Sequence, residues 1–230
     1  MAKPGKGAIT VTINGSAAMG SEGMTILELA RQSGIEIPTL CHHEELSAIG
    51  SCRICVVEVE GARTLVASCH TPIAPGMVIQ THSEKVLAAR RMITELLLAS
   101  HPDSCLVCDK ANRCQLRHIA TDLEAAQPQV RGRKRCYPIE DVSPYIKRDL
   151  SKCILCRRCV AACREMAGQN VLHMAYRGFN SKVVVDTDRP LDKEVCRDCD
   201  ICVNVCPTGA LSLVEESGSK KKGKPLFIKG

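Results

Sequence analysis

A duplicated run of cysteines constrains this 230-residue chain more than any other feature. Each copy reads Cys-x2-Cys-x2-Cys-x3-Cys, the second copy follows the first by 43 positions, and Pro207 comes directly after the last cysteine. This spacing is typical of proteins with two [4Fe–4S] clusters, in which the fourth cysteine of each run ligates the other cluster. The predicted ligand sets are Cys153, Cys156, Cys159 and Cys206 for one cluster, and Cys196, Cys199, Cys202 and Cys163 for the other.

Sixteen cysteines could also form a disulfide framework or zinc sites. The first ten residues contain neither an apolar core nor a cleavage site, so we predict no secretory signal. No apolar stretch approaches the length that spans a bilayer, and we expect no direct membrane insertion. In the cytoplasm thiols stay reduced and clustered cysteines indicate metal. We therefore expect a cytoplasmic, metal-binding protein.

The composition supports metal-dependent folding and argues against nucleic-acid binding. With two Phe, three Tyr and no Trp, the chain has few large side chains to fill a core. Clusters would supply part of the interior, so we expect the apo-protein to be poorly folded. The net charge of +6 would be offset by anionic clusters, and the chain offers almost no aromatic rings on which bases could stack.

Residues 8–81 are predicted to form a small α/β unit. An alternating strand over Ile9–Ile13 is followed by an Asn14-Gly15 turn, and Met24–Ser33 has helical periodicity with Gly34 as its stop. Paired strands around Gly61 and a final strand complete a pattern compatible with a β-grasp arrangement. These last strands are predicted over Cys55–Val59, Arg63–Ala67 and Met77–Thr81.

This first unit carries the spacing Cys-x10-Cys-x2-Cys-x13-Cys, a close pair with a distant fourth cysteine. Plant-type [2Fe–2S] proteins use the same logic, although their first spacer is shorter. Structural zinc usually comes from two Cys-x2-Cys pairs, and only one is present here. The predicted [2Fe–2S] ligands are Cys41, Cys52, Cys55 and Cys69.

An amphipathic helix is predicted over residues 83–100, with Val86, Ala89, Ile93, Leu96 and Leu97 on its apolar face and Pro102 ending it. Three cysteines with short spacings follow, and they need a fourth donor to complete a [4Fe–4S] site. A histidine at a helix C-terminus can be explained by the helix dipole alone. Because three cysteines without a fourth partner come next, we favour ligation by His101, Cys105, Cys108 and Cys114.

The remaining segments carry no predicted site. Leu116–Glu124 continues as a short helix, Gln127–Tyr137 is a polar connector with a basic run, and Lys182–Val185 is a strand. Cys136 is the single cysteine outside the ligand sets, and we expect it to be a buried or semi-buried thiol. The predicted α+β chain thus divides into residues 1–82, 83–143 and 144–214, followed by a flexible basic tail over 215–230.

The sequence contains no P-loop, no G-x-G-x-x-G after a strand and no haem-attachment motif. All four predicted sites are saturated by protein ligands and leave no open iron for a substrate. Saturated iron–sulfur centres transfer single electrons, and several along one chain form a path between other subunits. We therefore predict a non-catalytic electron-transfer subunit, with ligand type, hydrogen bonding and burial setting the potentials.

The order of the motifs resembles three groups of proteins across residues 8–214. These are the N-terminal region of the large peripheral-arm subunit of complex I, the small diaphorase subunit of NAD-reducing hydrogenases, and the front part of [FeFe] hydrogenases. The resemblance implies a β-grasp [2Fe–2S] domain, a helical domain whose [4Fe–4S] cluster is held by His101 and three cysteines, and a two-cluster ferredoxin domain. Since the chain lacks the further domains of complex I and [FeFe] hydrogenases, we expect it to be nearest to stand-alone electron-transfer subunits.

The resemblance also implies partners that bear the catalytic chemistry. A flavin subunit would carry FMN and oxidise or reduce NAD(P)H, and a terminal subunit would be a hydrogenase, a formate dehydrogenase or another low-potential reductase. Such assemblies include complexes that bifurcate electrons. The competing predictions are a free multi-cluster ferredoxin and a structural or regulatory metal-binding module.

Overall fold

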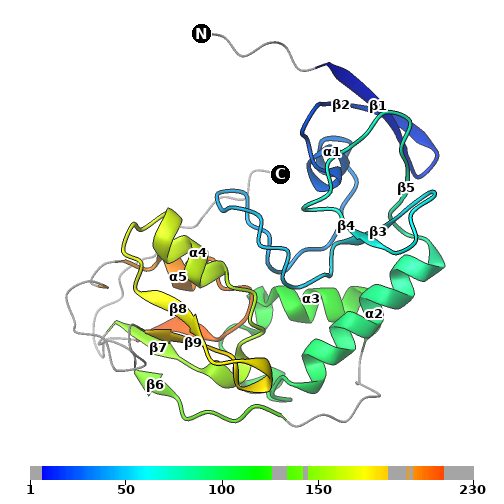
Figure 1. Cartoon of the computed structure of the whole chain (residues 1–230). Helices are drawn as coiled ribbons and strands as arrows, with labels where there is room; N and C mark the ends of the chain where they lie inside the picture. Colours follow the sequence, from blue (N-terminus) through cyan, green and yellow to red (C-terminus); the bar gives the residue numbers. More distant parts are fainter. Residues whose placement is uncertain (1–6, 126–133, 142–144, 186–195, 197–198, 215–230) are drawn as a thin grey trace.

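The computed structural model describes residues 7–125, 134–141, 145–185, 196 and 199–214 (Figure 1). The predicted basic tail and most of the connector therefore lie outside the described residues. Among the residues that are described, no helix combines the length and apolar character that a membrane crossing requires. The described elements form an N-terminal sheet unit, a helical pair in the middle of the chain, and a C-terminal unit of short strands and helices.

The N-terminal unit is built on a five-stranded mixed sheet in the order β2-β1-β5-β3-β4. Strands β1 and β5 pair in parallel at the centre, and the remaining neighbours are antiparallel. Asn14 and Gly15 both have positive φ, of 52° and 82°, which matches the tight hairpin turn that this dipeptide predicts. The strands are β1 (Ala8–Ile13), β2 (Ser16–Ser21), β3 (Val56–Val59), β4 (Val66–Ala67) and β5 (Val78–Gln80).

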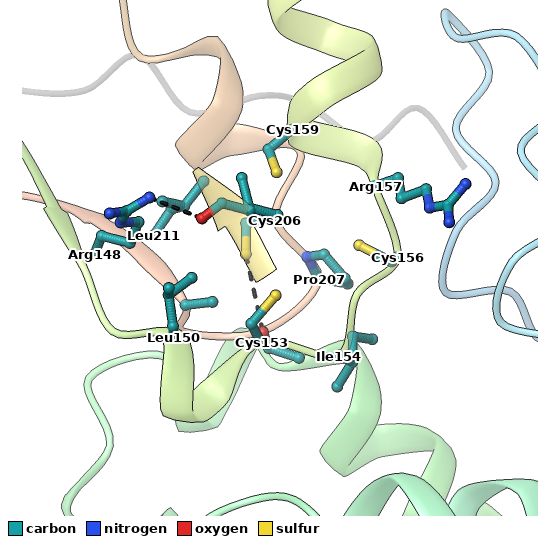
Figure 2. Close-up of a pocket in the computed structure, with 13 residues that line it drawn as sticks. Arg148, Leu150, Cys153, Ile154, Cys156, Arg157, Cys159, Cys206, Pro207 and Leu211 are labelled. Carbon is teal, nitrogen blue, oxygen red and sulfur yellow. Dashed lines mark hydrogen bonds between the residues drawn. The ribbon is translucent and has the colours of Figure 1, made fainter. Parts of the chain in front are cut away.

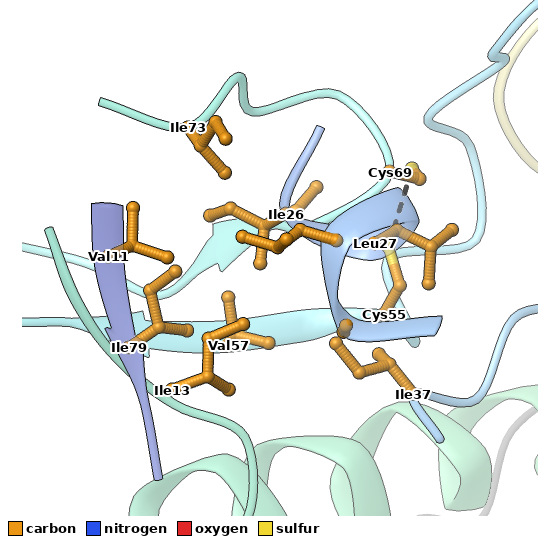
Figure 3. Packing of buried hydrophobic residues seen from close by; sticks show 13 residues of the cluster. Val11, Ile13, Ile26, Leu27, Ile37, Cys55, Val57, Cys69, Ile73 and Ile79 are labelled. Atoms are coloured by element: carbon orange, nitrogen blue, oxygen red, sulfur yellow. Dashed lines mark hydrogen bonds between the residues drawn. The ribbon is translucent and has the colours of Figure 1, made fainter. Parts of the chain in front are cut away.

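Helix α1 (Ile26–Gln32) packs its apolar face against this sheet (Figure 3). Thr25 and Glu28 form a capping box, in which each side chain accepts a hydrogen bond from the other residue's backbone N–H. Ile26 and Leu27 are completely buried together with Ile79 of the central strand. Burial of aliphatic side chains on both layers supplies the main stabilisation of this unit.

Helix α2 (Glu84–Ala99) and helix α3 (Gln115–Asp122) form the middle of the chain, joined by the turns η1 (Cys105–Val107) and η2 (Ala111–Arg113). The face that α2 buries matches the predicted one only in part, since Val86 is buried and Ile93 and Leu97 pack against a core cluster. Leu96 is 48% exposed, whereas the polar side chains of Arg90 and Thr94 are buried. The buried Arg90 Nη2 donates to the carbonyl of Val56 at 2.9 Å, so strand β3 binds a polar side chain that a simple apolar stripe would not predict.

The C-terminal unit pairs two small sheets with two short helices. Strands β10, β7 and β6 form one antiparallel sheet in that order, and β8 with β9 forms a hairpin whose register begins at Leu172 opposite Val185. The two short cysteine-bearing helices pack against each other, one also against β8 and the other against β10 (Figure 1). The elements are β6 (Glu140–Asp141), β7 (Ile146–Arg148), η3 (Leu150–Lys152), α4 (Arg158–Glu165), β8 (Leu172–Ala175), η4 (Gly178–Asn180), β9 (Lys182–Val185), α5 (Ile201–Asn204) and β10 (Leu211–Leu213).

Contacts between distant parts of the sequence join the three units. The backbone N–H of Ser47 donates to Glu165 Oε2 at 2.8 Å, and the N–H of Gln115 donates to the carbonyl of Pro207 at 2.9 Å. Leu46 is buried with Ala162 in a small apolar cluster that spans the N-terminal and C-terminal units. These contacts fix the loops that carry the predicted ligands relative to one another.

Candidate metal centres

The first predicted ligand set lies in the loop after α1 and beside strands β3 and β4. The four cysteines form two pairs, Cys41 with Cys52 and Cys55 with Cys69. The backbone N–H of Cys52 donates to Cys41 Sγ at 3.4 Å, and Cys55 Sγ lies 3.4 Å from Cys69 Sγ. Three of the four side chains are buried, and Figure 3 shows Cys55 and Cys69 at the edge of the aliphatic core. The fold thus brings all four predicted donors into one region as two pairs.

Hydrogen bonding within each pair favours a thiolate on one member. Donation from the Cys52 side chain lowers the pKa of Cys41 to about 5, and donation from Cys69 lowers the pKa of Cys55 to about 6. The pKa of each donating thiol is raised instead, because its proton is held by the partner. Thiolate is the form that ligates metal, and hydrogen bonding in each pair favours that form on one member.

His101 follows helix α2 and has the geometry of a metal ligand. Its Nδ1 lies 3.1 Å from the carbonyl of Pro102, whereas its Nε2 is buried and has no hydrogen-bond partner among the described residues. Burial lowers the pKa of His101, which favours the neutral ring. A neutral imidazole whose Nδ1–H is held by a carbonyl presents a free lone pair on Nε2, which is the usual arrangement of a ligating histidine.

The three cysteines that accompany His101 lie on the turns between α2 and α3. Burial raises the pKa of Cys114, and repulsion from Cys108 and Cys105 adds to that shift. Lys152 lies close to the histidine and to the cysteines of this set. Its backbone contacts His101, and its charge interacts with Cys108. A Cβ at Gly209 would meet Cys108 Sγ at 3.3 Å, so this loop of the C-terminal unit approaches the set as closely as glycine permits.

The two cysteine runs of the C-terminal unit line two separate cavities. Figure 2 shows the first, with the sulfurs of Cys153, Cys156, Cys159 and Cys206 around an apolar interior. The second cavity is lined by Cys163, Cys196, Cys199 and Cys202. The last cysteine of each run thus lines the other run's cavity. The N–H of Val171 also donates to Cys163 Sγ at 3.2 Å.

Burial dominates the acidity of these thiols. It raises the pKa of Cys156 and of Cys202 to about 12, and it raises the pKa of Cys153, Cys159 and Cys196 as well. Anionic sulfur in such an interior requires a compensating cation. The iron ions of an iron–sulfur cluster supply this positive charge, so the donors and their surroundings fit a cluster.

Among the described residues, no three His, Cys, Asp or Glu side chains stand together in a way that could hold one metal ion.

The structure differs from the sequence prediction at Cys136, and it buries Arg158, a residue that the sequence did not single out. Cys136 is exposed, not buried, because the irregular segment that carries it lies on the surface. Arg158 is 4% exposed although an arginine at a helix start is normally solvated. The signal that could have singled it out is its position inside a ligand run, directly before Cys159.

Three family models match successive parts of the chain. Residues 6–84 match a 2Fe-2S iron-sulfur cluster binding domain, residues 90–128 match the NADH-ubiquinone oxidoreductase-G iron-sulfur binding region, and residues 143–212 match the ferredoxin-like domain of NADH-quinone oxidoreductase subunit 3. The three regions follow one another in the order of the ligand sets described above.

Similar proteins include components of two kinds of oxidoreductase. The chain is 44% identical over 208 residues to NADP-reducing hydrogenase subunit HndD of Solidesulfovibrio fructosivorans, and 37% identical over 205 residues to a G-type component of the NADH-quinone oxidoreductase of Rhizobium meliloti. Each alignment covers 88% of this chain, which spans 36% of the first relative's length and 24% of the second's.

A solved structure of similar fold is a chain of NAD+-reducing [NiFe]-hydrogenase in the H2-reduced state. The TM-score is 0.80 at 29% sequence identity, and the match covers 94% of this chain and 90% of the hydrogenase chain. The likeness therefore extends over nearly the full length of both chains.

Proposed function

Because the chain is an iron–sulfur protein homologous to the G-type component of NADH-quinone oxidoreductase and to a subunit of an NADP-reducing hydrogenase, we propose that it is the electron-relay subunit of an NAD(P)H-linked oxidoreductase. The observation that carries the proposal is the grouping of fifteen of the sixteen cysteines, with His101, into four donor sets. Each set is complete without a substrate, which suits electron transfer and leaves no open coordination position for catalysis.

The proposed cofactors are one [2Fe–2S] cluster and three [4Fe–4S] clusters, which when bound supply single-electron transfer. The first would lie in a β-grasp domain, the second in the helical region, and the last two in a ferredoxin domain, with domain bounds at residues 1–82, 83–143 and 144–214. The four ligand sets are Cys41, Cys52, Cys55 and Cys69; His101, Cys105, Cys108 and Cys114; Cys153, Cys156, Cys159 and Cys206; and Cys196, Cys199, Cys202 and Cys163.

The protein's own contribution is to hold these sites at fixed spacing and away from water. Strands and helices of different units carry neighbouring ligand loops, and the contacts of Ser47 with Glu165 and of Gln115 with Pro207 hold these loops together. Backbone N–H groups next to Cys41 and Cys163 stabilise negative charge on sulfur. These contacts hold the ligand loops in fixed relative positions, as an electron relay requires.

The proposed partners bear the chemistry that this chain lacks. A flavin-containing subunit would exchange electrons with NAD(P)H, and a terminal subunit would be a hydrogenase, a formate dehydrogenase or another low-potential reductase. The names of the relatives, which include an NADPH-Fe(3+) oxidoreductase subunit of Geobacter sulfurreducens, support a nicotinamide-linked complex. Reduced thiols suit a cytoplasmic location.

Native purification tests this proposal. A tagged chain isolated anaerobically from its source should bring with it a flavoprotein, and NAD(P)H should bleach the iron–sulfur absorbance of the complex. Removing the flavoprotein should abolish bleaching by NAD(P)H while dithionite still bleaches the chain. Isolation of the chain alone would favour a free ferredoxin, and a zinc-loaded chain with no EPR signal after reduction would favour a structural module; either result would overturn the proposal.

A further inference from the structure

Arg158 is a buried cation at the point where the three units meet. It begins helix α4, directly before Cys159, and only 4% of its surface is exposed. Its neighbour Arg157 is exposed, and Figure 2 shows the Arg157 side chain directed away from the four sulfurs of the first cavity. Two adjacent arginines thus have opposite environments, and only one of them is buried among ligand loops.

The hydrogen bonds of Arg158 reach all three units. Its Nη1 donates to Gln115 Oε1 at 2.9 Å and to the carbonyl of Val205 at 3.5 Å, and its Nη2 donates to the carbonyl of His42. Each acceptor is the immediate neighbour of a proposed ligand: His42 follows Cys41, Gln115 follows Cys114, and Val205 precedes Cys206. One guanidinium therefore joins ligand loops of three different sites.

The charge of Arg158 has no carboxylate to balance it. No Asp or Glu lies within ion-pair distance of this guanidinium in the part of the chain that the structure describes. The ionisable groups that act on it are thiols. Burial lowers the pKa of Arg158, and Cys156 and Cys41 are the largest opposing influences, followed by Cys52 and Cys206. These thiols belong to the first and third ligand sets.

A buried, unpaired charge costs several kcal/mol of desolvation, so its presence calls for a compensating anion. The neutral carbonyl and amide acceptors of Arg158 accept hydrogen bonds from both Nη atoms but do not balance its charge. Thiolate-ligated clusters on both sides would supply negative charge where the structure offers no carboxylate. Arg90 provides a contrast, because it is also buried without a carboxylate but is influenced by Cys55 alone.

We propose that Arg158 is the shared counter-ion of the first and third sites, raising the reduction potential of both while positioning their ligand loops against the second. This inference rests on the proposed function, since it assumes clusters in those sites. Reduction adds negative charge to a cluster, and a fixed cation nearby stabilises the reduced form more than the oxidised form. The effect is large in a buried setting, where solvent and salt screen poorly.

Three matched substitutions in the full chain separate this role from general effects of charge removal. Arg158→Gln removes the buried shared cation, Arg90→Gln removes a buried cation beside the first site only, and Arg157→Gln removes an exposed cation adjacent in sequence. EPR-monitored redox titration measures the potentials of the individual clusters in each purified, iron-loaded variant.

Arg158→Gln should shift the potentials of the [2Fe–2S] cluster and of the cluster at Cys153 to more negative values, severalfold further than Arg157→Gln does. Arg90→Gln should shift only the [2Fe–2S] cluster. The shifts caused by Arg158→Gln should persist at high salt, whereas any shift from the exposed Arg157 should vanish. Unchanged potentials in Arg158→Gln, with all clusters present, would overturn the inference while leaving the proposed function intact.

Arg158→Lys distinguishes charge from hydrogen bonding. Lysine keeps the cation but loses the forked geometry of the guanidinium. The shared counter-ion account predicts that lysine restores most of both potentials. Should lysine and glutamine give equal shifts, Arg158 would have only a structural role. If Arg158→Gln fails to assemble clusters, the potentials of Arg158→Lys still decide the matter, since that variant retains the charge.

Discussion

The N-terminal and C-terminal units fill their interiors in opposite ways. The core of the N-terminal unit consists mainly of aliphatic side chains on β1, β5 and α1, and two of its predicted ligands, Cys55 and Cys69, lie at the edge (Figure 3). The core of the C-terminal unit includes Cys159, Cys163, Cys202 and Cys206, and it encloses two cysteine-lined cavities, the first of which is drawn in Figure 2. The N-terminal unit can therefore fold through the burial of apolar side chains. The C-terminal unit is expected to need the iron–sulfur clusters that its cysteines are proposed to bind.

Iron removal provides the largest expected effect. Anaerobic chelation, or expression without iron, should abolish hydrogen-exchange protection in α4 and in the β8–β9 hairpin, because their core includes four of the proposed ligands. Protection in β1, β3 and β5 should survive. This refines the expectation that the whole apo-protein is poorly folded. Equal loss of protection in both units would contradict the comparison.

Truncating a buried side chain in the core of the N-terminal unit should have the next largest effect. Ile79→Ala removes a completely buried side chain from the central strand β5 and should lower that unit's free energy of unfolding by about 2–5 kcal/mol. Denaturant melts followed by hydrogen exchange should give this loss with or without iron. The exposed Gln80→Ala on the same strand is the control and should change little.

Helix capping gives a smaller effect in the same unit. Thr25→Ala breaks the capping box of α1 and should cost about 1 kcal/mol. The matched control Ser16→Ala alters an exposed position at the start of β2 and should stay within about 0.5 kcal/mol. The loss measured by denaturant melts should be the same in the iron-free chain. A dependence on iron would mean that the N-terminal unit also relies on metal.

A ligand exchange should change potential more than stability. His101→Cys replaces a neutral donor with an anionic one, so the cluster at this site should persist with a lower potential. The shift should be a fraction of the roughly 250 mV or more that separates Rieske centres from plant-type ferredoxins. EPR-monitored titration measures it, with the exposed His118→Cys as control. An unchanged cluster and potential in His101→Ala would show that His101 is not a ligand.

Local sequence patterns predicted the regular elements well. The strand expected at Lys182–Val185 has those bounds, the helix expected over 83–100 spans Glu84–Ala99, and the Asn14-Gly15 turn joins β1 to β2. These features depend on neighbours a few residues away, so periodicity and turn chemistry suffice. The partition of cysteines into two cavities also followed from spacing, because short spacers restrict which sulfurs can meet.

Local sequence patterns could not predict the tertiary environment of individual side chains. The burial of Arg90 depends on a carbonyl of β3, and that of Arg158 depends on loops more than forty residues away along the chain. Residue type alone predicts that both side chains are solvated. The exposed Cys136 illustrates the converse, since a cysteine is usually buried and only its irregular surroundings place it at the surface.

Iron and acid-labile sulfide analysis, combined with EPR of the reduced chain, tests the central claim most directly. The account predicts iron and sulfide in equal amounts, in the quantity of one two-iron and three four-iron clusters per chain, with EPR signals from both cluster types. Stoichiometric zinc without sulfide, and a reduced chain without an EPR signal, would contradict it.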